Sequence, residues 1–251
     1  MPRAASLRQL FSHPKHRHAA PERDFSRSIL VDFRPEDQDG MCATLRVRWT
    51  ITPKIAPQPW LTCSRCGKLR AFQTSCKIRL NANGRKLDAW LIYKCVVCEK
   101  TWNRPIFERR NVGEIDSAEL EALQSNDPQW IRAEAFNLDA LRRRSQRIDE
   151  FPEFEIRKHV LAESPAWPRV EIEVMVPLPT NVRLDRLLAL ELGLPRPKLR
   201  ALHDAGIIQV SGNRSDVLGR RVKSGVVIAV DLATLSGSIE AWRQAMTGLM
   251  Q

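Results

Sequence analysis

Cys63-Ser64-Arg65-Cys66-Gly67 and Cys95-Val96-Val97-Cys98 contain four of the six cysteines of this 251-residue chain. Each Cys-x-x-Cys pair can form a tight turn that places two thiolates on the same side. Gly67 stands where such a turn often needs a residue that tolerates a positive φ. Two such turns, brought together, form the tetrahedral sulfur site that zinc prefers. The sequence therefore predicts that Cys63, Cys66, Cys95 and Cys98 bind a structural Zn²⁺ ion.

The 28 residues between the two pairs read as one β-hairpin. Apolar and polar residues alternate from Phe72 to Leu80, Asn83-Gly84 is a strong hairpin-turn signal, and Leu87–Lys94 reads as the return strand. A hairpin flanked by two such cysteine pairs is a zinc ribbon, and a long hairpin accommodates the wide spacing. Cys76 falls on the apolar side of the first strand, which predicts a buried structural cysteine, with a metal ligand or reactive thiol as the alternative.

The composition is that of a folded protein with room for two small domains or three very small units. Hydrophobic residues make up 43 % of the chain, and no apolar run approaches the roughly 20 residues of a membrane span. Residues 1–20 lack the apolar core of a signal peptide. We therefore expect reduced cysteines and a cytoplasmic location. Residues 1–40, with three irregularly spaced histidines, are predicted to be a disordered basic tail.

Net charge is +11, and it is unevenly distributed. Residues 61–110 hold 12 Lys and Arg against 3 Asp and Glu, whereas residues 111–180 hold 8 against 14. A basic ribbon beside an acidic segment suggests a surface for a polyanion, with nucleic acid as the first candidate. The alternative is an ordinary solvated surface.

Further elements can be placed by periodicity and capping signals. Leu45, Val47 and Trp49 alternate with arginines in a strand at the start of a predicted ribbon domain, residues 41–110. Residues 111–180 are expected to be a linker region of helices and one strand, 168–177. Asp127-Pro128 supplies an N-cap and an N1 proline for one of these helices.

Residues 181–235 change to a compact helix–helix–hairpin pattern, and residues 236–251 are expected to form a C-terminal tail helix. The Arg183-Leu184-Asp185 opening, a basic second helix and Val222-Lys223-Ser224-Gly225 before the last strand resemble the alpha-L RNA-binding motif. That motif occurs in a small-subunit ribosomal protein, pseudouridine synthases and some tRNA synthetases. The resemblance implies RNA contacts by basic side chains at the matching positions: Arg196, Lys198, Arg200, Arg220, Arg221 and Lys223.

Pro195 and Pro197 depart from this motif, because the family more often has a serine and a polar residue there. The alternative is a degenerate copy that serves as a protein-interaction or dimer module.

Residues 41 to about 235 together resemble the bacterial domain-of-unknown-function 1062 family. The carrying segments are Leu45–Trp49, Cys63–Lys68, Leu80–Gly84 and Trp102–Pro105. The resemblance supports the bacterial source and the architecture and implies no established activity. The expected fold class is α+β: an N-terminal zinc-ribbon β-domain, a helical spacer and a C-terminal α+β RNA-binding-like module.

The function predicted is a non-catalytic zinc-ribbon protein that binds structured RNA, ribosomal RNA or tRNA, and is ribosome-associated. No nucleophile–base or carboxylate constellation stands out, and His159 and His203 are isolated. The alternatives are a protein-interaction adaptor, a DNA-binding regulator and, less favoured, an RNA-modifying enzyme. A protein partner is a further possibility, a membrane is not expected, and the sequence leaves the oligomeric state open.

Overall fold

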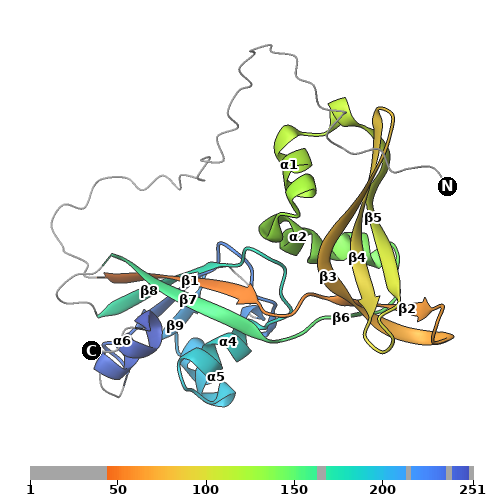
Figure 1. Ribbon diagram of the computed structural model, residues 1–251. Helices are drawn as coiled ribbons and strands as arrows, with labels where there is room; N and C mark the ends of the chain where they lie inside the picture. The colour runs from red at the N-terminus through yellow and green to blue at the C-terminus, as the bar shows by residue number, and fades with distance from the viewer. Residues whose placement is uncertain (1–43, 163–167, 213–215, 236–238, 249–251) are drawn as a thin grey trace, which may run out of the picture. The chain divides into compact units, whose positions relative to one another are not determined.

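The computed structural model describes residues 44–162, 168–212, 216–235 and 239–248 (Figure 1). The predicted tail, residues 1–40, lies outside this range. The described residues form two five-stranded sheets and six α-helices, so the predicted α+β class is confirmed. Within the same residues, no helix combines the length and the apolar character needed to cross a membrane.

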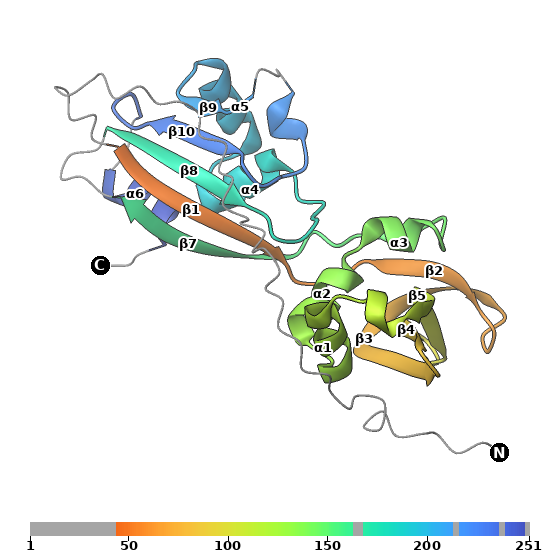
Figure 2. The same cartoon turned by 90° about the horizontal axis from the view of Figure 1, so that it is seen from above.

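The first sheet has the strand order β7-β1-β8-β10-β9, and Figure 2 shows its strands side by side. Strand β1 is antiparallel to β7 and parallel to β8. The bounds are β1 Thr44–Pro53, β7 Phe154–Ala162, β8 Arg169–Met175, β9 Ile208–Val210 and β10 Val227–Asp231. The helices associated with this sheet are α4 Leu184–Glu191, α5 Arg196–Asp204 and α6 Ile239–Thr247, with a 3-10 turn at Val217–Gly219.

One face of this sheet carries the larger hydrophobic core. The alternate residues of β1 predicted to be apolar, Leu45, Val47 and Trp49, are fully buried. They pack with side chains of α4, α5 and α6, which cover this face. On the opposite face, Arg48 of β1 forms an ion pair with Glu173 of β8 at 2.9 Å. The period-two pattern therefore separates a helix-covered face from a polar face.

The C-terminal helix α6 is fixed to the sheet by polar contacts as well as apolar ones. Trp49 Nε1 donates to the Met246 carbonyl at 2.7 Å. Lys158 donates to the Ala245 carbonyl and lies 2.6 Å from Glu191 Oε2 and 4.9 Å from the Trp49 ring centroid. Carbonyls at a helix C-terminus lack intrahelical donors, so a lysine and an indole N–H supply them here.

The second sheet has the order β5-β4-β3-β2-β6 and is built from one continuous part of the chain. Its strands are β2 Gln58–Cys63, β3 Lys68–Asn83, β4 Lys86–Cys95, β5 Thr101–Asn111 and β6 Ile148–Asp149. Its helices are α1 Ser117–Ser125, α2 Pro128–Ala135 and α3 Leu138–Arg142, preceded by a 3-10 turn at Val112–Glu114. We refer to residues 54–149 as the ribbon lobe, and to residues 44–53 and 154–248 as the sheet lobe.

The ribbon lobe is an insertion between two neighbouring strands of the sheet lobe. Strands β1 and β7 pair up to Pro53 and Phe154, and Lys54 N donates to the Glu153 carbonyl at 2.9 Å. Both ends of the insertion are therefore held together. The lobes therefore differ from the predicted domains. Residues 44–53, predicted as part of the ribbon domain, pair with strands of the sheet lobe. Helices α1 and α2, predicted as part of a linker region, pack on β3 of the ribbon lobe.

The hairpin β3–β4 is present, with a two-residue turn at Gly84-Arg85 in which Gly84 has φ +59°. A β-bulge between Thr74 and Ile78 interrupts the predicted alternation. Cys76 lies in this bulge with φ +55° and is exposed, so the prediction of a buried cysteine is wrong. The bulge inserts extra residues and rotates Cys76 out of the apolar row.

The α1–α2 turn fills the gap that the bulge leaves. Ile78 N, freed from the ladder, donates to Asn126 Oδ1 at 2.8 Å. Asp127 then caps α2 by accepting from Trp130 N at 2.6 Å, and Pro128 is the first helical residue. The capping prediction for this helix is confirmed.

A buried ion pair joins α2 to the sheet. The Arg104 side chain is 1 % exposed, and its Nη2 donates to Glu134 Oε1 at 2.8 Å and to the Glu134 carbonyl at 3.0 Å. Its other guanidinium nitrogens have no hydrogen-bond partner among the described residues. Burial raises the pKa of the adjacent Tyr93 to about 12, so this phenol stays neutral. Glu134 is therefore the anion that balances a buried cation.

We predict that Glu134→Ala lowers the free energy of unfolding by about 3 kcal/mol, because it leaves the Arg104 charge buried without its counterion. Urea unfolding measures this change. The matched control is Glu119→Ala, which removes the carboxylate from a partly exposed ion pair with Arg110. It is expected to cost less than about 1 kcal/mol. Equal losses in the two variants would contradict the assignment.

Candidate metal centre

The four predicted cysteine ligands come together at one end of the ribbon lobe. Cys63 ends β2 and Cys95 ends β4, while Cys66 and Cys98 lie in the turns that follow. The four sulfur atoms all lie within 4.8 Å of one another, and Cys63 Sγ is 3.4 Å from Cys98 Sγ. A tetrahedral ion with metal–sulfur bonds of about 2.3 Å requires sulfur separations of about 3.8 Å. The cluster could therefore hold a metal ion with small side-chain adjustments.

The two turns have the same backbone geometry. Gly67 N donates to the Cys63 carbonyl at 2.8 Å, and Glu99 N donates to the Cys95 carbonyl at 2.9 Å. Gly67 has φ +64° and Glu99 has φ +59°. The sequence indicated the first of these positions through its glycine, but a glutamate in the equivalent place gave no such signal. A side chain in this left-handed conformation is held there by the surrounding structure.

The pKa values of Cys63 and Cys98 are shifted in opposite directions. The backbone amide of Cys66 is the main cause that lowers the pKa of Cys63 to about 6, against the effect of burial. The Lys100 amide acts in the same direction on Cys98, but burial and hydrogen bonds with the other three thiols outweigh it and raise that pKa to about 12. Four thiolates this close need a cation to neutralise their charge, so metal binding and proton release are coupled.

Phe72, Tyr93 and Trp102 belong to the same hydrophobic cluster as the four cysteines. The Trp102 ring packs against Phe72 at 6.3 Å and Tyr93 at 5.3 Å between centroids. Arg65 Nη1 donates to the Cys98 carbonyl at 3.0 Å and so links the two turns. Trp102 and Tyr93 therefore pack beside the cluster.

The six basic residues predicted for RNA contact lie in the sheet lobe, not with the cysteines. Arg196, Lys198 and Arg200 are exposed on α5 and have no ion-pair partner within the described residues. Arg196 and Arg200 lie on one flank of the helix and Lys198 on the other. The remaining three are also exposed, but two are paired: Arg220 with Asp216 at 2.7 Å and Arg221 with Glu150 at 2.8 Å, while Lys223 has no such partner among these residues.

Arg79 and Trp90 were not among the predicted site residues. They lie on the outer face of the five-stranded sheet of the ribbon lobe. They are paired across β3 and β4, and Arg79 Cζ lies 5.8 Å from the centroid of the Trp90 ring. Trp90 is half-buried, and its indole N–H donates to Glu108 at 3.2 Å. Alternation along β4 could have revealed this pair, because the opposite residues, Ala89 and Leu91, are the buried ones.

The comparisons with known proteins give one match. No curated protein and no solved structure matches the chain. Residues 80–214 match the family described as "Protein of unknown function (DUF1062)". This match includes the β3–β4 turn, the second cysteine pair and helices α1 to α5, and it covers more than half of the chain. The chain therefore belongs to the DUF1062 family.

Proposed function

We propose that the cysteine cluster binds a structural Zn²⁺ ion. Four sulfur donors at nearly tetrahedral spacing form the ligand set that zinc prefers, and a complete set of protein ligands leaves no position for a substrate. The ion would join the β2–β3 turn to the β4–β5 turn. Because the ribbon lobe has a small hydrophobic core, this link would contribute directly to its folding.

We also propose that the protein binds structured RNA without catalysing a reaction, for which ribosomal RNA or tRNA is the candidate. The observation that carries this proposal is α5, where Arg196, Lys198 and Arg200 project into solvent without carboxylate partners among the described residues. Such side chains are available to phosphates. Arg220 and Arg221 would have to exchange an existing ion pair for a phosphate, so they would contribute less.

The outer face of the ribbon sheet offers a second contact of suitable chemistry. Arg79 over Trp90 combines a cation with a partly exposed aromatic ring. Lys94 of β4 and Asn103 of β5 lie on the same face of the sheet as this pair. An aromatic ring and cations together suit an unpaired base beside its phosphates. Trp60 makes the same two kinds of contact at shorter distances and is therefore less suitable: Arg147 Cζ lies 3.9 Å from its ring centroid, and Asp149 accepts from its indole N–H at 2.7 Å.

The zinc proposal predicts one equivalent of zinc per chain, measured by elemental analysis of the purified protein. Cys63→Ser and Cys95→Ser should each lose the metal and lower the melting temperature, since three thiolates hold the ion less tightly. Cys76→Ser is the matched control, because it removes a thiol from the same lobe outside the cluster. Full zinc retention in Cys63→Ser, or loss in Cys76→Ser, would refute the ligand assignment.

The RNA proposal predicts that affinity for bulk tRNA falls steeply with salt, because phosphate contacts release counterions. Arg196→Gln combined with Arg200→Gln should weaken binding and reduce the slope of log affinity against log salt by about 2, one for each lost contact. Fluorescence anisotropy across a salt series measures both quantities.

The matched control for the α5 variant is Arg157→Gln combined with Arg169→Gln. These arginines are exposed and ion-paired with neighbouring glutamates, so the control removes the same formal charge from another part of the sheet lobe. It should leave the slope nearly unchanged. Identical salt slopes for the two double variants would show that net charge, rather than α5, determines binding.

A further inference from the structure

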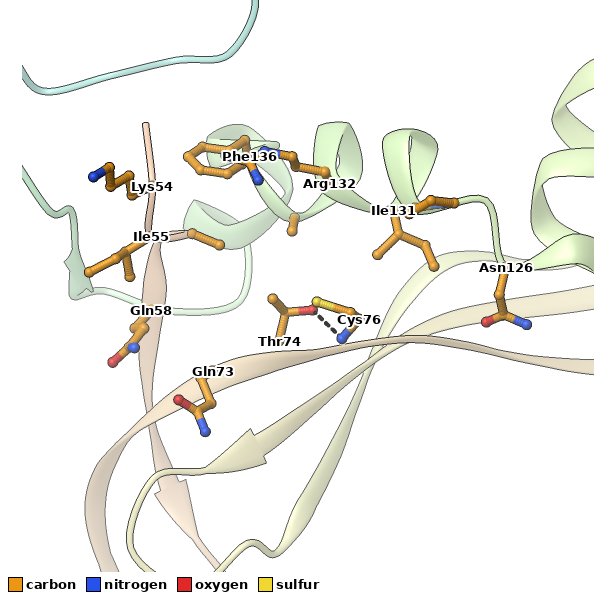
Figure 3. Close-up of a pocket in the computed structure, with 13 residues that line it drawn as sticks. Lys54, Ile55, Gln58, Gln73, Thr74, Cys76, Asn126, Ile131, Arg132 and Phe136 are labelled. Atoms are coloured by element: carbon orange, nitrogen blue, oxygen red, sulfur yellow. Dashed lines mark hydrogen bonds between the residues drawn. The ribbon is translucent and has the colours of Figure 1, made fainter. Parts of the chain in front are cut away.

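The ribbon lobe contains a cavity of about 450 Å³ that neither the cysteine cluster nor the proposed RNA contacts involve (Figure 3). The bulged part of β3 contributes Thr74 and Cys76, α2 forms one wall, and the connection from β1 to β2 forms the other. The volume is within the range of small-molecule sites, about 300–1,000 Å³. The bulge in β3 therefore lies at the edge of this cavity.

Part of the cavity wall is apolar. Ile131, Ala135 and Phe136 line it from the side of α2, and Ile55 lines it from the connecting segment. Ile55 is 39 % exposed, so part of its apolar side chain contacts water. A ligand with an apolar body would remove this surface from water, which is favourable by about 25 cal/mol for each Å² covered.

The charged side chains that line the cavity favour a negatively charged ligand. Lys54 and Arg132 line it, and no Asp or Glu is among the lining residues. Arg132 Nη2 donates to the Pro53 carbonyl, which fixes the position of the guanidinium group. Lys54 has no ion-pair partner within the described residues.

The neutral polar side chains of the cavity can donate hydrogen bonds to the same anion. Asn126 Oδ1 already accepts from Ile78 N, and Thr74 Oγ1 accepts from Cys76 N at 3.1 Å. The Thr74 O–H, the Asn126 amide N–H and the side-chain amides of Gln58 and Gln73, which also line the cavity, can each donate a hydrogen bond to a ligand. Cations and donors without competing carboxylates are complementary to an anion.

We propose that this cavity binds a small organic acid with an apolar body and one carboxylate. The apolar body contacts Ile55 and the α2 wall, and the carboxylate faces Lys54 and Arg132. The bound acid covers the Cys76 thiol, whose sulfur lies between β3 and α2 in Figure 3. This site is independent of the proposed RNA function, because it shares no residue with α5.

Three probes with the same ring separate charge from shape: phenylacetate, 2-phenylethanol and 2-phenylethylamine. Calorimetry on the full chain should detect binding of phenylacetate, with the alcohol weaker and the amine weakest. The exposed Cys76 thiol supplies a second readout through alkylation by iodoacetamide, followed by peptide mapping. At ten times its Kd, phenylacetate should slow alkylation of Cys76 about tenfold, because only the unliganded fraction reacts.

Lys54→Gln should weaken phenylacetate binding about tenfold, the loss of one charged hydrogen bond. Lys68→Gln is the matched control, because Lys68 is exposed at the start of β3 and does not line the cavity. Both variants remove an exposed charge and should fold normally. The proposal is overturned if phenylacetate neither binds nor protects Cys76, if the amine binds as tightly as the acid, or if the two variants bind equally.

Discussion

The antiparallel ladder between β1 and β7 is the constraint on which the two lobes depend. It brings residues 53 and 154 into register, so the ribbon lobe between them must start and finish at neighbouring positions. The same strand β1 also pairs with β8 and supplies fully buried side chains to the core of the sheet lobe. One strand therefore connects the stability of the larger core to the closure of the insertion. Because the folded ribbon lobe holds its own two ends close together, pairing β1 with β7 costs less loop-closure entropy than closing a flexible loop of the same length.

Within that closed insertion, the ribbon lobe combines a hydrophobic core with polar and metal-compatible contacts. The core around Phe72, Leu91 and Ile131 is smaller than that of the sheet lobe. The cysteine cluster joins the strands at one end, and the Arg104–Glu134 ion pair joins α2 to the sheet. Small units commonly need such additional links, because they bury a smaller fraction of their surface.

Local features of this structure were predictable from the sequence, and non-local pairings were not. The cysteine pairs, the β3–β4 hairpin and the Asp127 cap depend on residues within a few positions of one another, so spacing alone reveals them. The pairing of β1 with β7 and β8 joins residues more than 100 positions apart, and nothing in the period of β1 identifies its partners. The error at Cys76 has a different cause: alternation assumes an unbroken ladder, and a bulge changes which side of the strand faces the core.

The positions of the charged side chains show more about the available binding surface than the net charge of the chain does. The sequence pairs a basic segment, 61–110, with an acidic one, 111–180, and the structure places parts of the two in contact. Arg104 and Arg110 pair with Glu134 and Glu119 of the covering helices, so these arginines stabilise the lobe rather than face a partner. On α5, Arg196, Lys198 and Arg200 have no ion-pair partner among the residues that the structure describes. A polyanion would therefore contact only the arginines that are not paired with the acidic helices. The excess of Lys and Arg over Asp and Glu in residues 61–110 overstates the positive charge available to such a partner.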